Sequence, residues 1–229
     1  MGPERIEDLR LDQAGDQTLD ELRARLAPRI AAAAVFDGWS HAALAAAAAE
    51  TGTDPALAAY AFDGGPMAMI AAWIADVDAR MAAALPAPAL AAMPVRERIR
   101  RLIAFRLEAI AGQEEALRRA LAVMALPRNA PRALRLGWNS ADAMWRLAGD
   151  HATDYNHYTK RAILAGVYAA TLAVFAEDAS EGKAETLAFL NRRIDGIISF
   201  EKTKARLLKP RDEVFSLSRF LGRLRYPAR

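Results

Sequence analysis

The sequence predicts an all-α protein. Alanine supplies much of an apolar fraction of 53%, while aromatic residues make up only 7% of the chain. Alanine favours helix over strand, and the sequence contains no alternation of Val, Ile or Thr that would indicate a strand. Capping residues, prolines and glycines divide the chain into segments of helical length. We therefore expect a series of helices joined by short turns.

The first predicted helix follows a charged N-terminal segment. Residues 1–17 are predicted to be a disordered arm. Thr18 and Glu21 have the spacing of a capping box, in which the hydroxyl accepts from a first-turn amide and the carboxylate reaches back to the cap. The helix should extend to about Val35, with a kink or a restart at Pro28.

Two shorter helices follow, and the three together predict a helix-turn-helix-like unit over residues 18–65. Ser40 is the predicted N-cap of a helix that ends at Glu50. Asp54 and Pro55 form the next start signal, since aspartate caps helices and proline is favoured at the first helical position. This layout, with tight turns between short helices, resembles the N-terminal domain of TetR-type regulators.

The residues that bind DNA are missing from this unit. No Lys or Arg lies between Phe36 and Pro66, whereas four acidic residues do. A recognition helix must neutralise phosphates and reach base edges, usually with Arg, Lys, Asn or Gln. We predict no nucleic-acid partner, and we keep a TetR-type transcriptional regulator that senses a lipophilic ligand as the alternative function.

The following residues, 66–208, predict a domain of longer helices that forms a homodimer. The predicted helices cover residues 66–85, 94–111, 113–126, 131–149, 154–177 and 182–208, separated by prolines and glycines. The apolar residues predicted to form the dimer contact are Val167, Leu172 and Phe175 on one helix and Leu187, Leu190, Ile194, Ile197 and Ile198 on the next.

The core of this domain is either filled or encloses an apolar cavity, and the sequence leaves both open. Alanine-rich helices approach closely, so filling depends on a few large side chains, which are more often ordinary packing than a binding site. Trp138 and Trp145 recur at helical spacing and are predicted to face inward. The large residues predicted to line such a cavity are Trp73, Ile74, Met81, Phe105, Met124, Trp138 and Trp145.

No pattern in the sequence indicates catalysis, a metal site or a cofactor. The chain has no cysteine, which excludes disulfides, thiolate metal sites and cysteine nucleophiles. It has three histidines. His151 and His157 lie six residues apart, whereas a helical metal pair requires i, i+4 spacing. We predict a non-enzymatic protein.

Residues 209–229 predict a short, basic amphipathic helix that binds a membrane surface. Residues 202–229 contain nine Lys or Arg against two Asp or Glu, whereas residues 1–201 contain 22 against 26. An apolar stripe flanked by arginine is typical of helices that lie in the membrane interface. Docking on the protein's own helices, or on a second copy, is the alternative. The predicted membrane-binding residues are Val214, Leu217, Phe220, Leu221 and Leu224, flanked by Arg219 and Arg223.

The N-terminus has no basic segment followed by an apolar run, and no stretch of 18 uninterrupted apolar residues is present. We therefore expect no secretion signal and no spanning helix. The predicted location is the cytoplasm, with peripheral association at the inner face of the cytoplasmic membrane.

The most distinctive segment is 151–162, His-Ala-Thr-Asp-Tyr-Asn-His-Tyr-Thr-Lys-Arg-Ala, with Asp-Ala-Met-Trp-Arg-Leu-Ala-Gly-Asp before it at 142–150. The string Phe-Leu-Asn-Arg-Arg-Ile at 189–194 continues the pattern. Together these segments resemble the ninth of the Coq proteins, a family of lipid-binding accessory proteins of ubiquinone biosynthesis. The resemblance covers about residues 18–208, and the C-terminal amphipathic helix is similar in kind.

This resemblance implies a TetR-like dimer that has lost DNA binding, binds an isoprenoid quinone or phospholipid and presents a quinone intermediate to a di-iron hydroxylase at the membrane. It implies a hydroxylase contact formed by Asp142, Met144 and Leu147 on one helix and by His157, Tyr158 and Arg161 on the next. The family often has Trp where this chain has His157, which puts that contact in doubt.

The residues themselves support this patch less strongly. Met144 and Leu147 lie three residues apart beside the tryptophan stripe, so we expect both to be exposed near Tyr158. An ordinary surface with helix-capping residues is the alternative. A dimer that scaffolds pathway enzymes without holding lipid is a third option for the function.

Overall fold

This computed structural model describes residues 17–150 and 155–208, and within these ranges the secondary structure is helical. The chain divides into two units, residues 1–191 and residues 192–229. The predicted N-terminal arm and the predicted membrane helix lie outside the described residues, apart from residue 17. The second unit is represented by the C-terminal part of helix α11 (Ala184–Leu208).

Helix α2 (Leu19–Asp37) begins with the predicted capping box. The Glu21 amide donates to the Thr18 hydroxyl at 3.2 Å, and the Thr18 amide donates to the Glu21 carboxylate at 2.9 Å. Pro28 lies inside the helix and does not divide it, so the expected restart is wrong. Its apolar face packs on α3 and α5, which holds the helix together across the proline.

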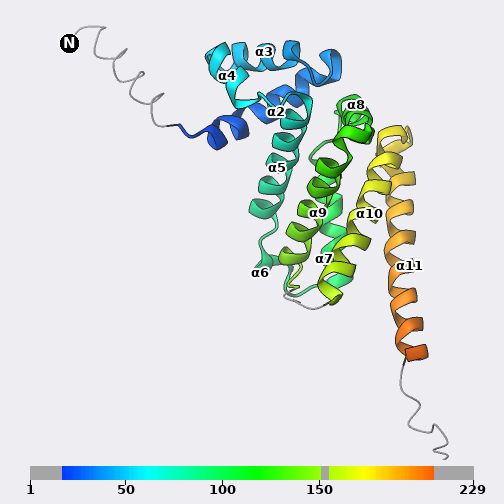
Figure 1. The fold of residues 1–229 in the computed structure, drawn as a ribbon. Helices are drawn as coiled ribbons and strands as arrows, with labels where there is room; N and C mark the ends of the chain where they lie inside the picture. The colour runs from blue at the N-terminus through cyan, green and yellow to red at the C-terminus, as the bar shows by residue number, and fades with distance from the viewer. Residues whose placement is uncertain (1–16, 151–154, 209–229) are drawn as a thin grey trace, which may run out of the picture. The chain divides into compact units, whose positions relative to one another are not determined.

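Helices α3 (His41–Glu50) and α4 (Pro55–Ala61) complete the N-terminal unit with the predicted caps. The Ser40 hydroxyl accepts from the Ala43 amide at 3.4 Å, and the Asp54 carboxylate accepts from the Leu57 amide at 2.9 Å. Figure 1 shows α2, α3 and α4 together at one end of α5, consistent with the contacts of α2 with the other three helices.

The longer helices lie close to their predicted bounds. They are α5 (Pro66–Ala84), α7 (Val95–Glu108), α8 (Glu114–Ala125), α9 (Ala130–Leu147), α10 (Tyr155–Glu177) and α11, with short 3₁₀ turns at Pro127–Asn129 and Glu181–Lys183. A four-residue helix, α6 (Ala87–Leu90), was not predicted. It is too short for an apolar period, and its alanines and prolines read as a loop.

The core of the first unit lies where α5, α9 and α10 meet their neighbours. Helix α5 packs on α2, α7, α8 and α9, while α10 packs on α7, α8 and α9 (Figure 1). Trp39 joins the N-terminal unit to this bundle, because its indole N–H donates to the Ala116 carbonyl at 2.9 Å and its ring lies 5.2 Å from that of Trp73.

Among the residues that the structure describes, one helical segment, His157–Glu177, is long and apolar enough to cross a membrane, and Pro55–Ala61 with Pro66–Ala84 would also qualify if that pair, bent by 84°, were one span. The expectation that no helix spans a membrane rested on uninterrupted apolar runs, and it stays a prediction, because length and composition alone do not show a span. In the structure, α10 packs on α7, α8 and α9, and it contains the buried Arg161. Core helices of helical bundles commonly pass the same test.

Candidate functional site

The candidate site is an apolar cavity of about 500 Å³ between α5, α7, α8, α9 and α10. Ligand pockets commonly have roughly 300–1,000 Å³ and mostly apolar walls with a few polar groups. The alternative of a completely filled core is thus wrong for the described residues. The lining residues include Ile70, Trp73, Ile74, Val77, Ile110, Leu117, Leu121, Met124, Leu134, Leu136, Trp138 and Leu172.

Four of the predicted lining residues face this cavity: Trp73, Ile74, Met124 and Trp138. They come from three helices, α5, α8 and α9, whose apolar faces converge on the same space. The sequence could find them because large residues are sparse among the alanines. Whether they bind lipid stays a prediction.

Met81, Phe105 and Trp145 do not line the cavity, so the prediction for these three is wrong. Met81 is fully buried in the core. Trp145 packs against α10 instead, where its indole N–H donates to the Lys160 carbonyl at 3.1 Å. Which turn of a helix borders an empty space depends on its neighbours, and helical spacing alone cannot give this.

The cavity opens beside α9. Leu134 lines the cavity and is nevertheless 75% exposed, which places it at the rim. Gly137 and Gly166 also line the cavity, and a Cβ atom on either would have no neighbour within 4 Å. The glycines therefore widen the cavity.

A polar group interrupts the apolar wall at Arg106, Ser140 and Tyr168. Arg106 is 2% exposed and forms an ion pair with Asp78, and its guanidinium lies 4.8 Å from the centroid of the Tyr168 ring. Burial acts to lower the pKa of Arg106, but Tyr168 and Asp78 outweigh this effect, so the pKa is raised above its usual value. These residues were not predicted from the sequence, although the arginine at position 106, between the apolar Ile103 and Leu107, is a visible signal.

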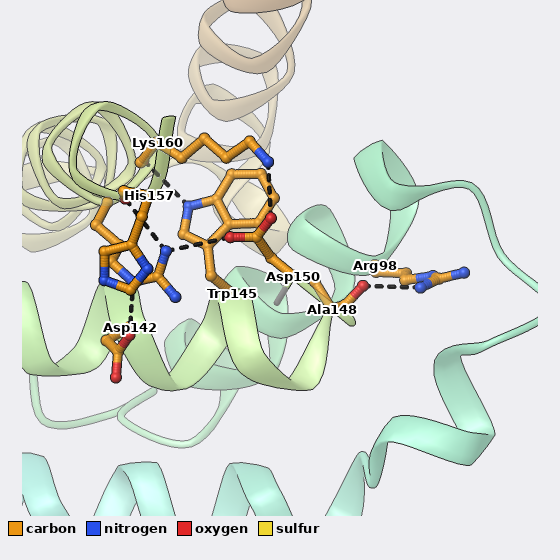
Figure 2. A network of polar contacts seen from close by, with 8 residues as sticks. Arg98, Asp142, Trp145, Ala148, Asp150, His157 and Lys160 are labelled. Atoms are coloured by element: carbon orange, nitrogen blue, oxygen red, sulfur yellow. Dashed lines mark hydrogen bonds and ion pairs between the residues drawn. The ribbon is translucent and has the colours of Figure 1, made fainter. Parts of the chain in front are cut away.

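Two residues of the predicted hydroxylase contact, Asp142 and Arg161, belong to a network of hydrogen bonds and ion pairs at the start of α10 (Figure 2). Arg161 is 1% exposed and donates to Asp142 at 2.5 Å, to Asp150 at 3.1 Å and to the His157 carbonyl at 3.1 Å. Lys160 donates to the other oxygen of Asp150 at 2.7 Å. Asp142 and Asp150 thereby tie the end of α9 to the first turns of α10 across residues 151–154.

This network changes the interpretation of the predicted patch. Met144 is fully buried, so the expectation that it is exposed is wrong, and Leu147 is only half-buried. Arg161 is likewise buried, because its guanidinium is used within the chain. Helical spacing placed Met144 beside the tryptophans, but the face covered by α10 is wider than that stripe.

Tyr158 is the exposed aromatic residue of this patch, at 62%. Its ring lies 6.0 Å from that of Trp138, which lines the cavity, and 5.1 Å from the half-buried His157. The predicted patch and the cavity thus share a wall, a relation that the sequence did not reveal.

The predicted dimer residues are partly engaged within the chain. Leu172 lines the cavity, and Phe175 is buried with the Lys183 ammonium 4.9 Å from its ring centroid. Leu190 is also buried, whereas Leu187 is 43% exposed. The side chains of Ile197 and Ile198 lie outside the described residues. The homodimer stays a prediction.

The arginines of α2 are used inside the N-terminal unit. Arg29 pairs with Glu50 at 2.7 Å, Arg25 donates to the Thr53 hydroxyl at 3.2 Å, and Arg23 donates to the Ala61 carbonyl at 2.8 Å. Within the described residues, no group of three His, Cys, Asp or Glu side chains is placed to hold a metal ion.

Comparison with solved structures supports the predicted fold class. A TetR transcriptional regulator from Nitrosomonas europaea has a TM-score of 0.62 at 20% sequence identity, and the match covers 78% of this chain and 98% of that chain. Such a likeness shows the fold alone. Fold and cavity together define an all-α, TetR-like protein with an apolar cavity in its helical bundle.

The sequence relatives are more specific. A model of the COQ9 family matches residues 130–201. The mitochondrial ubiquinone biosynthesis protein COQ9 of Rattus norvegicus is 32% identical over 204 residues, which is 84% of this chain and 65% of the rat protein. The Bos taurus protein is 31% identical over 204 residues, covering 84% and 64%. The predicted resemblance is confirmed: the chain is a relative of the COQ9 proteins, and it spans just under two thirds of the length of these two.

Proposed function

We propose that this protein is a non-enzymatic accessory protein of ubiquinone biosynthesis that binds an isoprenoid quinone intermediate and presents it to a di-iron hydroxylase at a membrane. The observation that carries the proposal is the apolar cavity of about 500 Å³. Water excludes polyprenyl chains strongly, so transfer of such a lipid needs an apolar container. The similarity to COQ9 proteins, which are named for ubiquinone biosynthesis, supports the assignment to this pathway.

The cavity suits this task because it has an opening and an adjoining exposed aromatic residue. Leu134 marks the opening, and Tyr158 lies against Trp138 in the same wall. A lipid that leaves past Leu134 would emerge beside the patch proposed to contact the hydroxylase. The basic segment at residues 209–229 would hold the protein at the inner face of the cytoplasmic membrane.

The test is to identify the lipid that co-purifies with the protein, by native mass spectrometry followed by lipid extraction. We expect an isoprenoid quinone or a phospholipid in the wild type. Gly137→Leu should remove most of it, because the new side chain projects into open space at the cavity wall. The thermal unfolding temperature of this variant should not fall, because leucine favours helix over glycine. A wild-type protein that contains no lipid would contradict the proposal.

The TetR-like fold favours one alternative, a transcriptional regulator that senses a lipophilic ligand. Helices α3 and α4 contain no Lys or Arg, and the arginines of α2 are tied to neighbouring groups. A gel shift with salt-sensitive binding to the protein's own promoter would support this alternative.

A further inference from the structure

One side of the cavity is formed by a stretch of chain that contains no acidic residue. Residues 116–141, which run from α8 into α9, contain five Arg and no Asp or Glu. Leu121, Met124 and Leu134 of this stretch line the cavity. The inner side of the stretch is therefore apolar, and the charges that it carries on its outer side are all positive.

Three of these arginines are exposed and have no carboxylate partner among the described residues. The two arginines on α8 pair with Glu115. Arg128, Arg132 and Arg135 are exposed, and no described Asp or Glu forms an ion pair with them. The guanidinium of Arg132 lies near the turn between α4 and α5 without pairing with Asp63 of that turn. Their charges are thus available to an anionic partner.

Exposed leucines lie among the three arginines. Leu134, at the rim of the cavity, is 75% exposed, and Leu126, directly after α8, is 40% exposed. We call Leu126, Arg128, Arg132, Leu134 and Arg135 the mouth surface. Large exposed apolar side chains mark interaction sites, and their combination with cations is typical of surfaces that enter the interface of an anionic bilayer.

An anionic lipid surface matches both features of the mouth surface. The planar guanidinium of Arg binds phosphate groups well, while leucine side chains gain free energy by leaving water for the acyl boundary. A nucleic acid would use the arginines but not the leucines. The cavity adds a reason of its own, because a water-insoluble ligand reaches an apolar opening most directly from an apolar medium.

We propose that the mouth surface is a second membrane-docking site, which sets the opening of the cavity against the anionic head groups of a bilayer. Leu126 and Leu134 enter the interface, the three arginines bind lipid phosphates, and lipid passes into the cavity without crossing water. The surface is small, so it acts once the basic C-terminal segment has brought the protein to the bilayer. The inference rests on the proposed lipid-binding function and deepens it, because it names the route by which lipid enters.

The first test uses the full chain, whose lack of cysteine allows one labelled cysteine to report on one position. Leu134→Cys carries the dye NBD, and the vesicles are phosphatidylcholine alone or mixed with phosphatidylglycerol. With the anionic vesicles, the emission should shift to the blue and be quenched by nitroxide-labelled lipid, because the dye leaves water. The matched control is Phe36→Cys in the N-terminal unit, at a position that is 82% exposed, and its dye should stay in water.

The second test measures the arginines by co-sedimentation with the same vesicles. The triple variant Arg128→Gln, Arg132→Gln and Arg135→Gln should partition into anionic vesicles at least about tenfold more weakly, since each cation near an anionic leaflet contributes roughly fivefold. A second triple variant loses the same charge at arginines that pair with carboxylates elsewhere, and it should partition nearly as the wild type does. Its changes are Arg29→Gln, Arg80→Gln and Arg101→Gln.

The outcomes separate this inference from the proposed function. If the dye at position 134 stays in water while the protein sediments with the vesicles, or if the two triple variants partition equally, the mouth surface is overturned. Shielding of the dye only when the proposed hydroxylase is added would also overturn it, because the surface would then be a protein contact. If the dye enters the bilayer but no lipid co-purifies with the protein, the mouth surface stands and the proposed carrier function fails.

Discussion

At the scale of the residue, two arginines stand out because they are among the largest fully buried side chains of the described structure. Arg106 lies in the cavity wall, and Arg161 joins α10 to the end of α9. Fully buried arginines are rare and need partners that balance their charge. Asp78 serves Arg106, while Asp142 and Asp150 serve Arg161.

Replacing Arg161 tests its structural role. Arg161→Ala should lower the free energy of unfolding by about 3 kcal/mol, because two poorly exposed carboxylates lose their shared partner. The matched control is Arg146→Ala, whose side chain is 73% exposed and pairs with the same Asp142 at 2.7 Å. The control should cost less than about 1 kcal/mol. Equal losses in urea unfolding experiments would show that the burial of Arg161 has no energetic weight.

Asp178 predicts a pH dependence of stability. Its carboxylate accepts from the Ser180 hydroxyl at 2.5 Å, from the Thr186 hydroxyl at 2.6 Å and from both amides at 2.8 Å, and these bonds hold its pKa well below 3.8. The unfolded chain therefore binds this proton at a higher pH than the folded chain does. The stabilisation is complete above the unfolded pKa of about 3.9 and is lost as the pH falls below it.

The measurement is urea unfolding of the wild type and Asp178→Asn at several pH values. The wild type should be more stable by a constant amount from pH 8 to about pH 5, and this difference should shrink below about pH 4. A difference that grows in acid would have the wrong sign for a carboxylate with a lowered pKa.

At the scale of the element, the sequence predicted most helix starts because the signals are local. Thr18, Ser40 and Asp54 cap α2, α3 and α4 as expected. Each cap needs only residues one turn away, so it can be recognised without the rest of the protein. Pro28 shows the limit of local rules, because packing of α2 on α3 and α5 keeps the helix continuous.

The basic C-terminal segment gives the prediction at this scale. Deleting residues 211–229 should abolish flotation with liposomes that contain anionic lipids, because the deletion removes the predicted apolar stripe together with five Arg against two Asp or Glu, a net charge of +3. Helicity measured by circular dichroism should change little. A variant that keeps the residues and reverses Arg219 and Arg223 to Glu is the control for charge. Flotation that survives the deletion would place membrane binding elsewhere in the chain.

At the scale of the whole molecule, the cavity joins the predicted lipid site to the predicted partner surface. Trp138 lines the cavity from the inside and contacts the exposed Tyr158 on its outer side. A partner bound at Tyr158 would therefore sit next to the opening marked by Leu134. Under the proposed function, a partner at Tyr158 would receive the lipid directly from the cavity.

The partner surface can be tested with a pair of tyrosines. Tyr158→Ala should weaken co-purification with the di-iron hydroxylase by at least tenfold, as expected for an aromatic anchor of an interface. Tyr60→Ala is the matched control, because Tyr60 is 65% exposed but lies on α4 in the N-terminal unit. The thermal unfolding temperatures of the two variants should be similar. Equal co-purification of the two would remove Tyr158 from the proposed contact.

The sequence by itself determined the helical class, the caps, the absence of basic residues on α3 and α4, and the resemblance to the COQ9 proteins. Only the tertiary structure decided that Trp73, Ile74, Met124 and Trp138 share a cavity, that Met144 and Arg161 are buried, and that Arg106 is in the cavity wall. The reason is physical. Caps and helical periodicity depend on residues within one or two turns, whereas a cavity depends on which faces of distant helices meet and where their side chains fail to fill the space.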